Sequence, residues 1–269
     1  MRVYRWGTVS KRLFARLSVI ILTMALGTAC APRQIKLVAL IDPAPLLEVV
    51  YARQSAFEKG LSGSLELSFK NSKQRFKGRV YIVAYPDGRF RLEVPGTLGS
   101  TLLVMANDNR EILAFYPGEK RAYRSTVTGR SINPHLPFPL PVDPTLLPAL
   151  IMGVFPGDDG VSVAEAHLMD SGEKLLQTVS RDTGLQFTYL FDKGPGHSLR
   201  KITVRGREFE VTVHTRRKSD HLPLDFILTL AEGVLKGEWD SVKPFGGDEA
   251  AIKLHLPESV SVTDLEASR

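Results

Sequence analysis

The chain has 269 residues, with 35 lysines and arginines against 29 aspartates and glutamates, a formal net charge of +6 and a single cysteine. An apolar fraction of 43% and a charged fraction of 24% are typical of a globular protein and exclude a disordered or collagen-like chain. One cysteine excludes an internal disulfide and a cysteine-based zinc site.

The positive charge is concentrated at the N-terminus. Residues 1–29 contain five basic residues and no acidic residue, which leaves 30 basic and 29 acidic residues in the remainder, a net charge of +1. The uncharged run of 13 residues from Leu17 to Ala29 is shorter than the ~20 residues that span a bilayer. This pattern predicts a secretory signal peptide, with a membrane anchor or a buried helix as the alternatives. Export and the nearly neutral remainder argue against a nucleic-acid partner.

The end of this segment, Leu26-Gly27-Thr28-Ala29-Cys30, resembles the lipobox of bacterial lipoproteins, although Gly27 stands where leucine is commonest. The alternative is ordinary cleavage after Ala29, which leaves a free thiol in an oxidising compartment. We therefore expect lipidation of Cys30. The resemblance, with Ala31 instead of aspartate after the cysteine, implies a lipid anchor in the outer membrane and a domain that faces the periplasm. The predicted organisation is a signal peptide at 1–29, a lipidated tether at 30–41 and one domain at 42–269.

The first part of this domain begins with a helix and continues as strands. Asp42-Pro43 is a helix start, Gly60 is a stop, and the apolar face comprises Leu46, Val49, Val50, Ala56 and Phe57. Alternation of apolar and polar residues then predicts strands at 61–69, 75–82, 89–94, 102–105, 112–116 and 121–125.

A proline-rich stretch at 134–148 leads into a short apolar helix that contains Leu146, Leu147, Leu150 and Ile151 and ends at Gly153. Further strands are expected at 174–181, 185–192, 199–205, 208–216, 224–230 and 250–256. Many short antiparallel strands indicate a mainly β (α+β) fold, a barrel or a strongly curved sheet, with the helices covering or plugging an open side.

Signals for catalysis and metal binding are absent from the sequence. None of the six histidines has a second histidine three or four residues away, and the sequence has no G-x-S-x-G motif and no phosphate-binding loop. We expect no enzyme activity, cofactor or metal, while distant residues could still converge in space. The basic runs at 70–79 and 216–218 are either a solvated surface or contacts to anionic headgroups.

The segment Arg89-Phe90-Arg91-Leu92-Glu93-Val94-Pro95-Gly96-Thr97-Leu98-Gly99-Ser100-Thr101-Leu102-Leu103-Val104 resembles the LolB branch of the LolA/LolB lipoprotein-localisation family. The order of lipobox, early helix, meander and a helix from Leu146-Leu147 to Pro156 agrees with it. The loop departs from the family pattern, because it reads Pro-Gly-Thr-Leu-Gly instead of Gly-Pro-Leu-Gly.

The resemblance implies a half-open antiparallel β-barrel covered by helices, with an apolar cavity for acyl chains. It also implies that Leu98 is an exposed leucine that helps to insert lipoproteins into the outer membrane, whereas the residues alone allow Leu98 to fold back onto the barrel rim. Alternation places one set of apolar residues on one side of the sheet, where they line a cavity or fill a core. This set is Phe90, Leu92, Leu102, Val104, Leu113 and Phe115.

The expected function is that of an outer-membrane lipoprotein that binds the acyl chains of lipoproteins and helps to localise or insert them. Its expected partners are the inner leaflet of the outer membrane, lipoprotein acyl chains and a LolA-like periplasmic carrier. The alternatives are an envelope assembly or structural lipoprotein that uses the same fold to bind a protein, and an unrecognised periplasmic hydrolase.

Overall fold

A computed structural model describes residues 36–96, 99–126, 130–137, 144–156, 161–215, 222–231 and 233–265. The chain divides into two units at Lys36, and the described residues belong almost wholly to the second, Leu37–Arg269. The sheet domain therefore begins at Leu37 and takes in part of the predicted tether at 30–41.

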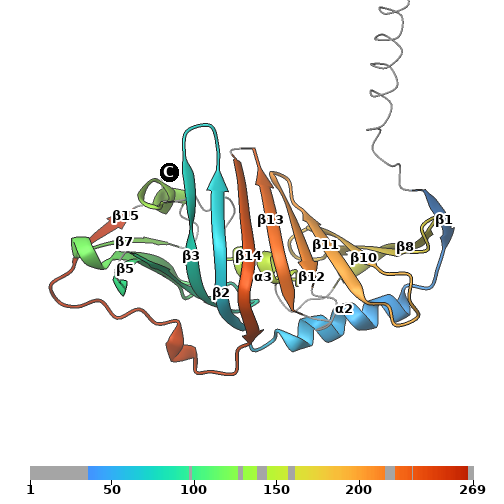
Figure 1. Cartoon of the computed structure of the whole chain (residues 1–269). Helices are drawn as coiled ribbons and strands as arrows, with labels where there is room; N and C mark the ends of the chain where they lie inside the picture. The colour runs from blue at the N-terminus through green and yellow to red at the C-terminus, as the bar shows by residue number, and fades with distance from the viewer. Residues whose placement is uncertain are drawn as a thin grey trace, which may run out of the picture. The chain divides into compact units, whose positions relative to one another are not determined.

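The second unit is built on one sheet of fifteen strands (Figure 1). The strand order is β1-β8-β9-β10-β11-β12-β13-β14-β2-β3-β4-β5-β6-β7-β15, and all neighbours are antiparallel except β15 and β7, which are parallel. Because β1 and β15 each have one neighbour, the sheet is open at both ends. The mainly β prediction is confirmed, and the sheet does not close into a barrel.

The first meander of strands comprises β2 (Leu61–Lys70), β3 (Arg75–Ala84), β4 (Phe90–Pro95), β5 (Thr101–Asn107), β6 (Glu111–Tyr116) and β7 (Arg121–Thr126). The second comprises β8 (Val161–Met169), β9 (Lys174–Ser180), β10 (Gln186–Phe191), β11 (Leu199–Arg205), β12 (Phe209–Thr215), β13 (Pro223–Leu230) and β14 (Gly233–Pro244). The edge strands are β1 (Leu37–Leu40) and β15 (Ser261–Leu265).

The two meanders join in the middle of the sheet, where β14 pairs with β2 from Val234–Lys70 to Pro244–Leu61. The strands β1, β8, β14 and β15 were not predicted from the sequence. The strand predicted at 250–256 is wrong, because this stretch contains a short 3-10 helix, η4 (Glu249–Ala251), and no strand.

Alternating burial along the strands gives the sheet one core face. In β10, Phe187, Tyr189 and Phe191 are buried, whereas the residues between them are partly exposed or exposed. β2 and β4 show the same period of two, as expected for strands with one covered face.

Two α-helices pack on this core face: α2 (Ala44–Ala56) and α3 (Leu147–Met152) (Figure 1). α2 starts where the sequence indicates, with Asp42 Oδ1 accepting a hydrogen bond of 3.0 Å from the Ala44 N–H. α3 is buried along its whole length and ends at Gly153, whose φ of 65° suits glycine. In the described residues, no helix combines the length and apolar character needed to cross a membrane.

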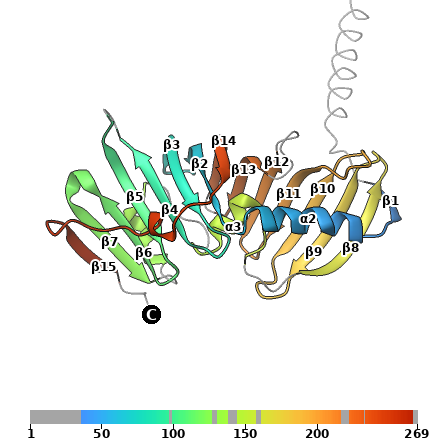
Figure 2. The same ribbon diagram turned by 90° about the horizontal axis from the view of Figure 1, so that it is seen from below.

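The opposite face of the β4–β6 region is covered by the segment between β14 and β15, as the view from below shows (Figure 2). Ile252 of this segment is buried, and Lys253 O accepts a hydrogen bond of 3.2 Å from Arg91 Nη1 of β4. Two further 3-10 helices, η2 (Pro117–Glu119) and η3 (Arg130–His135), flank β7 in the chain.

Candidate functional site

The candidate site is the layer in which α2 and α3 cover the core face of the sheet. α2 directs Leu46, Val50, Arg53 and Phe57 inward, at the spacing of one helical stripe. All six residues of α3 are apolar or proline and buried. An acyl chain that replaced these helix contacts would find an apolar surface on the sheet.

Arg53 is a charged residue in the middle of this apolar stripe. Its side chain is 1% exposed, its Nε donates to Gly153 O over 3.3 Å, and its Nη2 donates to Met152 O. Both acceptors are carbonyls at the C-terminal end of α3, where a helix leaves carbonyls without internal partners. Arg53 therefore connects α2 to the end of α3.

The environment of this guanidinium is largely apolar. Its Cζ lies 5.1 Å from the centre of the Phe57 ring, a cation–π contact. Burial lowers the pKa of Arg53 from its ordinary value to about 9, although the nearby Tyr189 acts in the opposite direction. The group is still charged at neutral pH, and hydrogen bonds to the carbonyls offset part of its desolvation.

Gln54, the next residue, connects α2 to the residues that follow α3. Its Nε2 donates to Phe155 O over 3.2 Å, and its Oε1 accepts from Phe155 N over 3.0 Å. The Phe155 ring packs edge-to-face on Phe187, with ring centres 4.7 Å apart, and on Tyr189 at 6.2 Å. This pair of bonds fixes an aromatic cluster between α3 and β10.

Tyr189 and Thr178 place two hydroxyl groups in this apolar interior. Both side chains are almost wholly buried, and neither hydroxyl oxygen has a hydrogen-bond partner of ordinary geometry. Burial raises the pKa of the Tyr189 hydroxyl well above 10, so the group is neutral at any physiological pH.

Among the hollows that described residues line, three are open to the surface. The first, of about 260 Å³, lies between α2 and the β10–β11 turn, with Glu48, Val49 and His197 in its lining. A second, of about 390 Å³, lies over His214 and Lys236. A third, of about 420 Å³, lies beside Tyr81.

His214 and Asp225 form a histidine–carboxylate pair, with 2.6 Å between Nδ1 and Oδ1. They are neighbours on β12 and β13, and both side chains are partly exposed. No described serine or threonine hydroxyl is hydrogen-bonded to His214, so within the described residues the pair has no hydroxyl nucleophile bound to it. In the described part of the chain, no group of three histidine, cysteine or acidic side chains has the arrangement needed to hold a metal ion.

The six predicted cavity residues do not share a face. β4 pairs with β5 so that Leu92 lies opposite Met105 and Phe90 opposite Asn107, which puts Phe90 and Leu92 on the core face with Leu103 and Met105. The other four of the set, Leu102, Val104, Leu113 and Phe115, lie on the opposite face. Leu102 is 47% exposed there, whereas Val104 and Leu113 are buried.

The expectation of one common face is therefore wrong. In β5 the core-facing residues are Leu103 and Met105, not Leu102 and Val104, and a run of five successive apolar residues in its sequence conceals the register. A role in lining a lipid site remains a prediction for Phe90 and Leu92.

Cys30 and Leu98 lie outside the described residues. The loop that contains Leu98 is closed at its base by a hydrogen bond of 2.8 Å from Gly96 N to Ser100 O. Gly99 has a φ of 79°. Lipidation of Cys30 and presentation of Leu98 therefore remain predictions.

Sequence reasoning missed Arg53, Gln54 and Tyr189. A signal for Arg53 was present, because Leu46, Val50, Arg53 and Phe57 are spaced by four, three and four residues, so the arginine falls within the apolar stripe. Gln54 gives no such signal, because its partner Phe155 is 101 residues away.

Comparisons with known proteins identify the fold. No family model and no curated protein matches the sequence. A LolA superfamily protein from Nitrosomonas europaea superposes with a TM-score of 0.50 at 8% identity, over 77% of this chain and 97% of that one. A putative outer membrane lipoprotein-sorting protein domain from Vibrio parahaemolyticus also gives a TM-score of 0.50, at 13% identity, over 77% and 95%. The sheet and its two covering helices thus have the fold of LolA superfamily proteins.

Proposed function

We propose that this protein is an outer-membrane lipoprotein that faces the periplasm, binds the acyl chains of lipoproteins and helps to localise or insert them in the outer membrane. The observation that carries the proposal is an open sheet whose apolar core face is covered by α2 and by the wholly buried α3. The fold is shared with a putative outer membrane lipoprotein-sorting domain, which supports a carrier role.

Acyl binding in this site needs no covalent chemistry. Each methylene group that leaves water contributes ~0.8 kcal/mol, so a chain that inserts between the helices and the sheet is stabilised by burial alone. The polar links that hold α2 to the end of α3 come from Arg53 and Gln54. In this proposal, separation of the two helices at these links admits the chain, and Phe90 and Leu92 form part of the wall that it meets.

The anchor belongs to the same proposal. Lipidated Cys30 holds the protein in the inner leaflet of the outer membrane, and the loop that carries Leu98 contacts the bilayer or the cargo. A LolA-like periplasmic carrier is the proposed donor of lipoproteins, and transfer follows the gradient of apolar burial.

Mass spectrometry of the mature protein purified from membranes tests this proposal. We expect a diacylglyceryl thioether and an amide-linked acyl chain on Cys30, together with co-purified lipid or lipoprotein. A protein that has neither acyl groups nor bound lipid contradicts the anchor and the carrier role together.

The packing of the interior favours a second candidate, an envelope assembly lipoprotein that binds a protein partner. Phe155, Phe187 and Tyr189 fill the space beside α3 with aromatic rings in direct contact. Titration of the acylated protein with a spin-labelled fatty acid separates the two functions. Saturable binding that Leu150→Trp abolishes supports the carrier, because the larger side chain would fill the acyl site, whereas absence of binding supports the assembly protein.

A further inference from the structure

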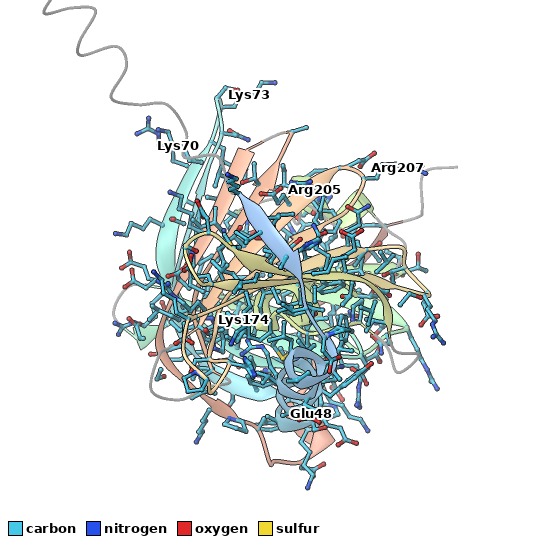
Figure 3. All side chains as sticks on the ribbon, turned by 90° about the vertical axis from the view of Figure 1, so that its right-hand side faces the viewer. Glu48, Lys70, Lys73, Lys174, Arg205 and Arg207 are labelled. Atoms are coloured by element: carbon cyan, nitrogen blue, oxygen red, sulfur yellow. The ribbon has the colours of Figure 1, made fainter. Side chains whose placement is uncertain are left out.

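The edge strand β1 exposes an unusual amount of apolar surface. Its four residues are Leu37, Val38, Ala39 and Leu40, and all are exposed, with Leu37 at 45%, Val38 at 59% and Leu40 at 72%. The strand lies at one end of the sheet (Figure 1), and Figure 3 looks onto this end, where β1 crosses the front of the view.

This exposure differs from the pattern in the rest of the sheet. Inner strands expose one face and bury the other, whereas β1 exposes the side chains on both faces. Among the described strands it pairs with β8 alone, with Leu37 opposite Met169 and Leu40 opposite His167. Exposed edge strands in water are usually protected by charges or proline, and β1 contains neither.

The chain immediately before β1 restricts what can cover it. Cys30 precedes Leu37 by seven residues, so their Cα atoms cannot be more than roughly 25 Å apart. Arg33 and Lys36 lie in this stretch, and no acidic residue occurs between Cys30 and Ile41. A lipid on Cys30 therefore keeps β1 near the bilayer, with cations that match anionic headgroups.

We propose that β1 rests on the bilayer, with Leu37, Val38 and Leu40 in the interfacial region, as a second membrane contact beside the lipid anchor. This inference rests on the proposed lipidation of Cys30. An acyl anchor alone leaves the domain free to rotate about its tether, whereas a second contact next to the tether sets its orientation. Pairing of β1 with a second copy is less favourable, because a strand of four residues offers few backbone groups.

A depth measurement with an environment-sensitive dye tests the inference. The chain has one cysteine, and a thioether-linked Cys30 has no free thiol, so Leu40→Cys creates a single labelling site in the mature acylated protein. The matched control is Val262→Cys on β15, the opposite edge strand, where the native side chain is 37% exposed. Both proteins are labelled with a nitrobenzoxadiazole dye and reconstituted in vesicles of phosphatidylethanolamine with a minority of phosphatidylglycerol.

At position 40 we expect blue-shifted emission and quenching by nitroxide-labelled lipid at least about threefold stronger than at position 262. Val38→Asp in the Leu40→Cys chain should return the emission towards that of the dye in water. A dye at position 40 that emits as in water overturns the inference in favour of a free edge. A blue shift that increases with the number of protein molecules per vesicle, and not with lipid contact, overturns it in favour of pairing between copies.

The intact mass of each labelled protein separates this result from the proposed function. One dye together with acyl groups on Cys30 shows that the anchor is present, so a solvent-exposed position 40 then contradicts only the inference about β1. Two dyes per chain show a free thiol at Cys30, which contradicts the anchor on which both proposals rest.

Discussion

Gln54 and Phe155 are joined by two hydrogen bonds, in which the glutamine amide donates to the Phe155 carbonyl and accepts from the Phe155 N–H. The pair connects α2 to the segment that follows α3, although the two residues are 101 positions apart in the sequence. Arg53, the preceding residue, binds the last carbonyls of α3, so one turn of α2 holds the end of α3 against the sheet.

Gln54→Ala removes both bonds and should lower the free energy of unfolding by about 1–2 kcal/mol, because the partly buried Phe155 N–H and carbonyl lose their partners. Urea denaturation followed by circular dichroism measures the change. Ser55→Ala, at the next and exposed position of the same helix, is the control and should stay within ~0.5 kcal/mol of wild type. Equal effects at the two positions would show that the bonds contribute nothing.

Arg53→Met keeps much of the apolar stem and removes the guanidinium. We expect a loss of about 2 kcal/mol at neutral pH, since the carbonyls of Met152 and Gly153 lose a charged donor in a buried site. If α2 and α3 separate to admit an acyl chain, the rate at which this variant binds the spin-labelled fatty acid should differ from the wild-type rate. Stability equal to that of wild type would contradict the importance of this link.

The stability of the wild type relative to Arg53→Met should also depend on pH in a defined direction. The pKa of Arg53 is about 9 in the folded protein and has its higher, ordinary value in the unfolded chain, so between these values the unfolded state binds more protons. The free energy of unfolding of the wild type should therefore rise relative to the variant as the pH passes through about 9. Denaturation curves of both proteins at a series of alkaline pH values measure the difference, and a difference that falls with pH contradicts the lowered pKa.

Gly63→Ala should destabilise the sheet by about 2 kcal/mol or more. A Cβ at this position would lie 2.1 Å from Ser241 O, a backbone atom at the irregularity in the β14–β2 pairing, so a strand must shift to admit it. Gly118→Ala is the control, because a Cβ there meets nothing within 4 Å. Thermal melting of both variants checks the prediction, which fails if Gly63→Ala melts at the wild-type temperature.

Leu98→Glu should leave the melting temperature unchanged and reduce lipoprotein insertion into vesicles by about tenfold, because a charged side chain opposes contact with an apolar bilayer region. Leu102→Glu, at a position 47% exposed on β5, is the matched control and should insert cargo at the wild-type rate. Insertion measured by flotation of a radiolabelled lipoprotein gives the answer, and a normal rate for Leu98→Glu would exclude the proposed role of this loop.

The sequence predicts those elements whose pattern is local. The alternation in Leu61–Lys70 and Phe90–Pro95 has the correct register, and both predicted α-helices are found. The second ends at Gly153 as predicted, whereas α2 ends at Ala56, before the predicted stop at Gly60. The pattern fails for Leu102 and Val104, since an unbroken apolar run is compatible with either face. It also fails at 250–256, where an alternating sequence covers the outside of the sheet instead of joining it.

The interior of the site could be predicted only in part, because its polar groups depend on contacts between distant segments. Arg53 lies on a helical stripe that the sequence displays, but its carbonyl partners belong to α3, about one hundred residues later. The stripe indicates that Arg53 is buried, but it does not indicate which carbonyls the guanidinium binds, and an arginine on a helix is most often solvated.

The pairing of β14 with β2, where the two meanders join, has a consequence for the order in which the protein folds. The meander from β2 to β7 and the one from β8 to β14 each consist of neighbours in sequence, which form quickly, whereas Val234 and Lys70 meet only by closing most of the chain into a loop. A chain that emerges through a membrane pore from its N-terminus thus stays in two separate halves until nearly all of it has crossed. If the chain is exported as proposed, the centre of the sheet forms only after β14 has crossed, and only the edge pair of β15 with β7 forms later.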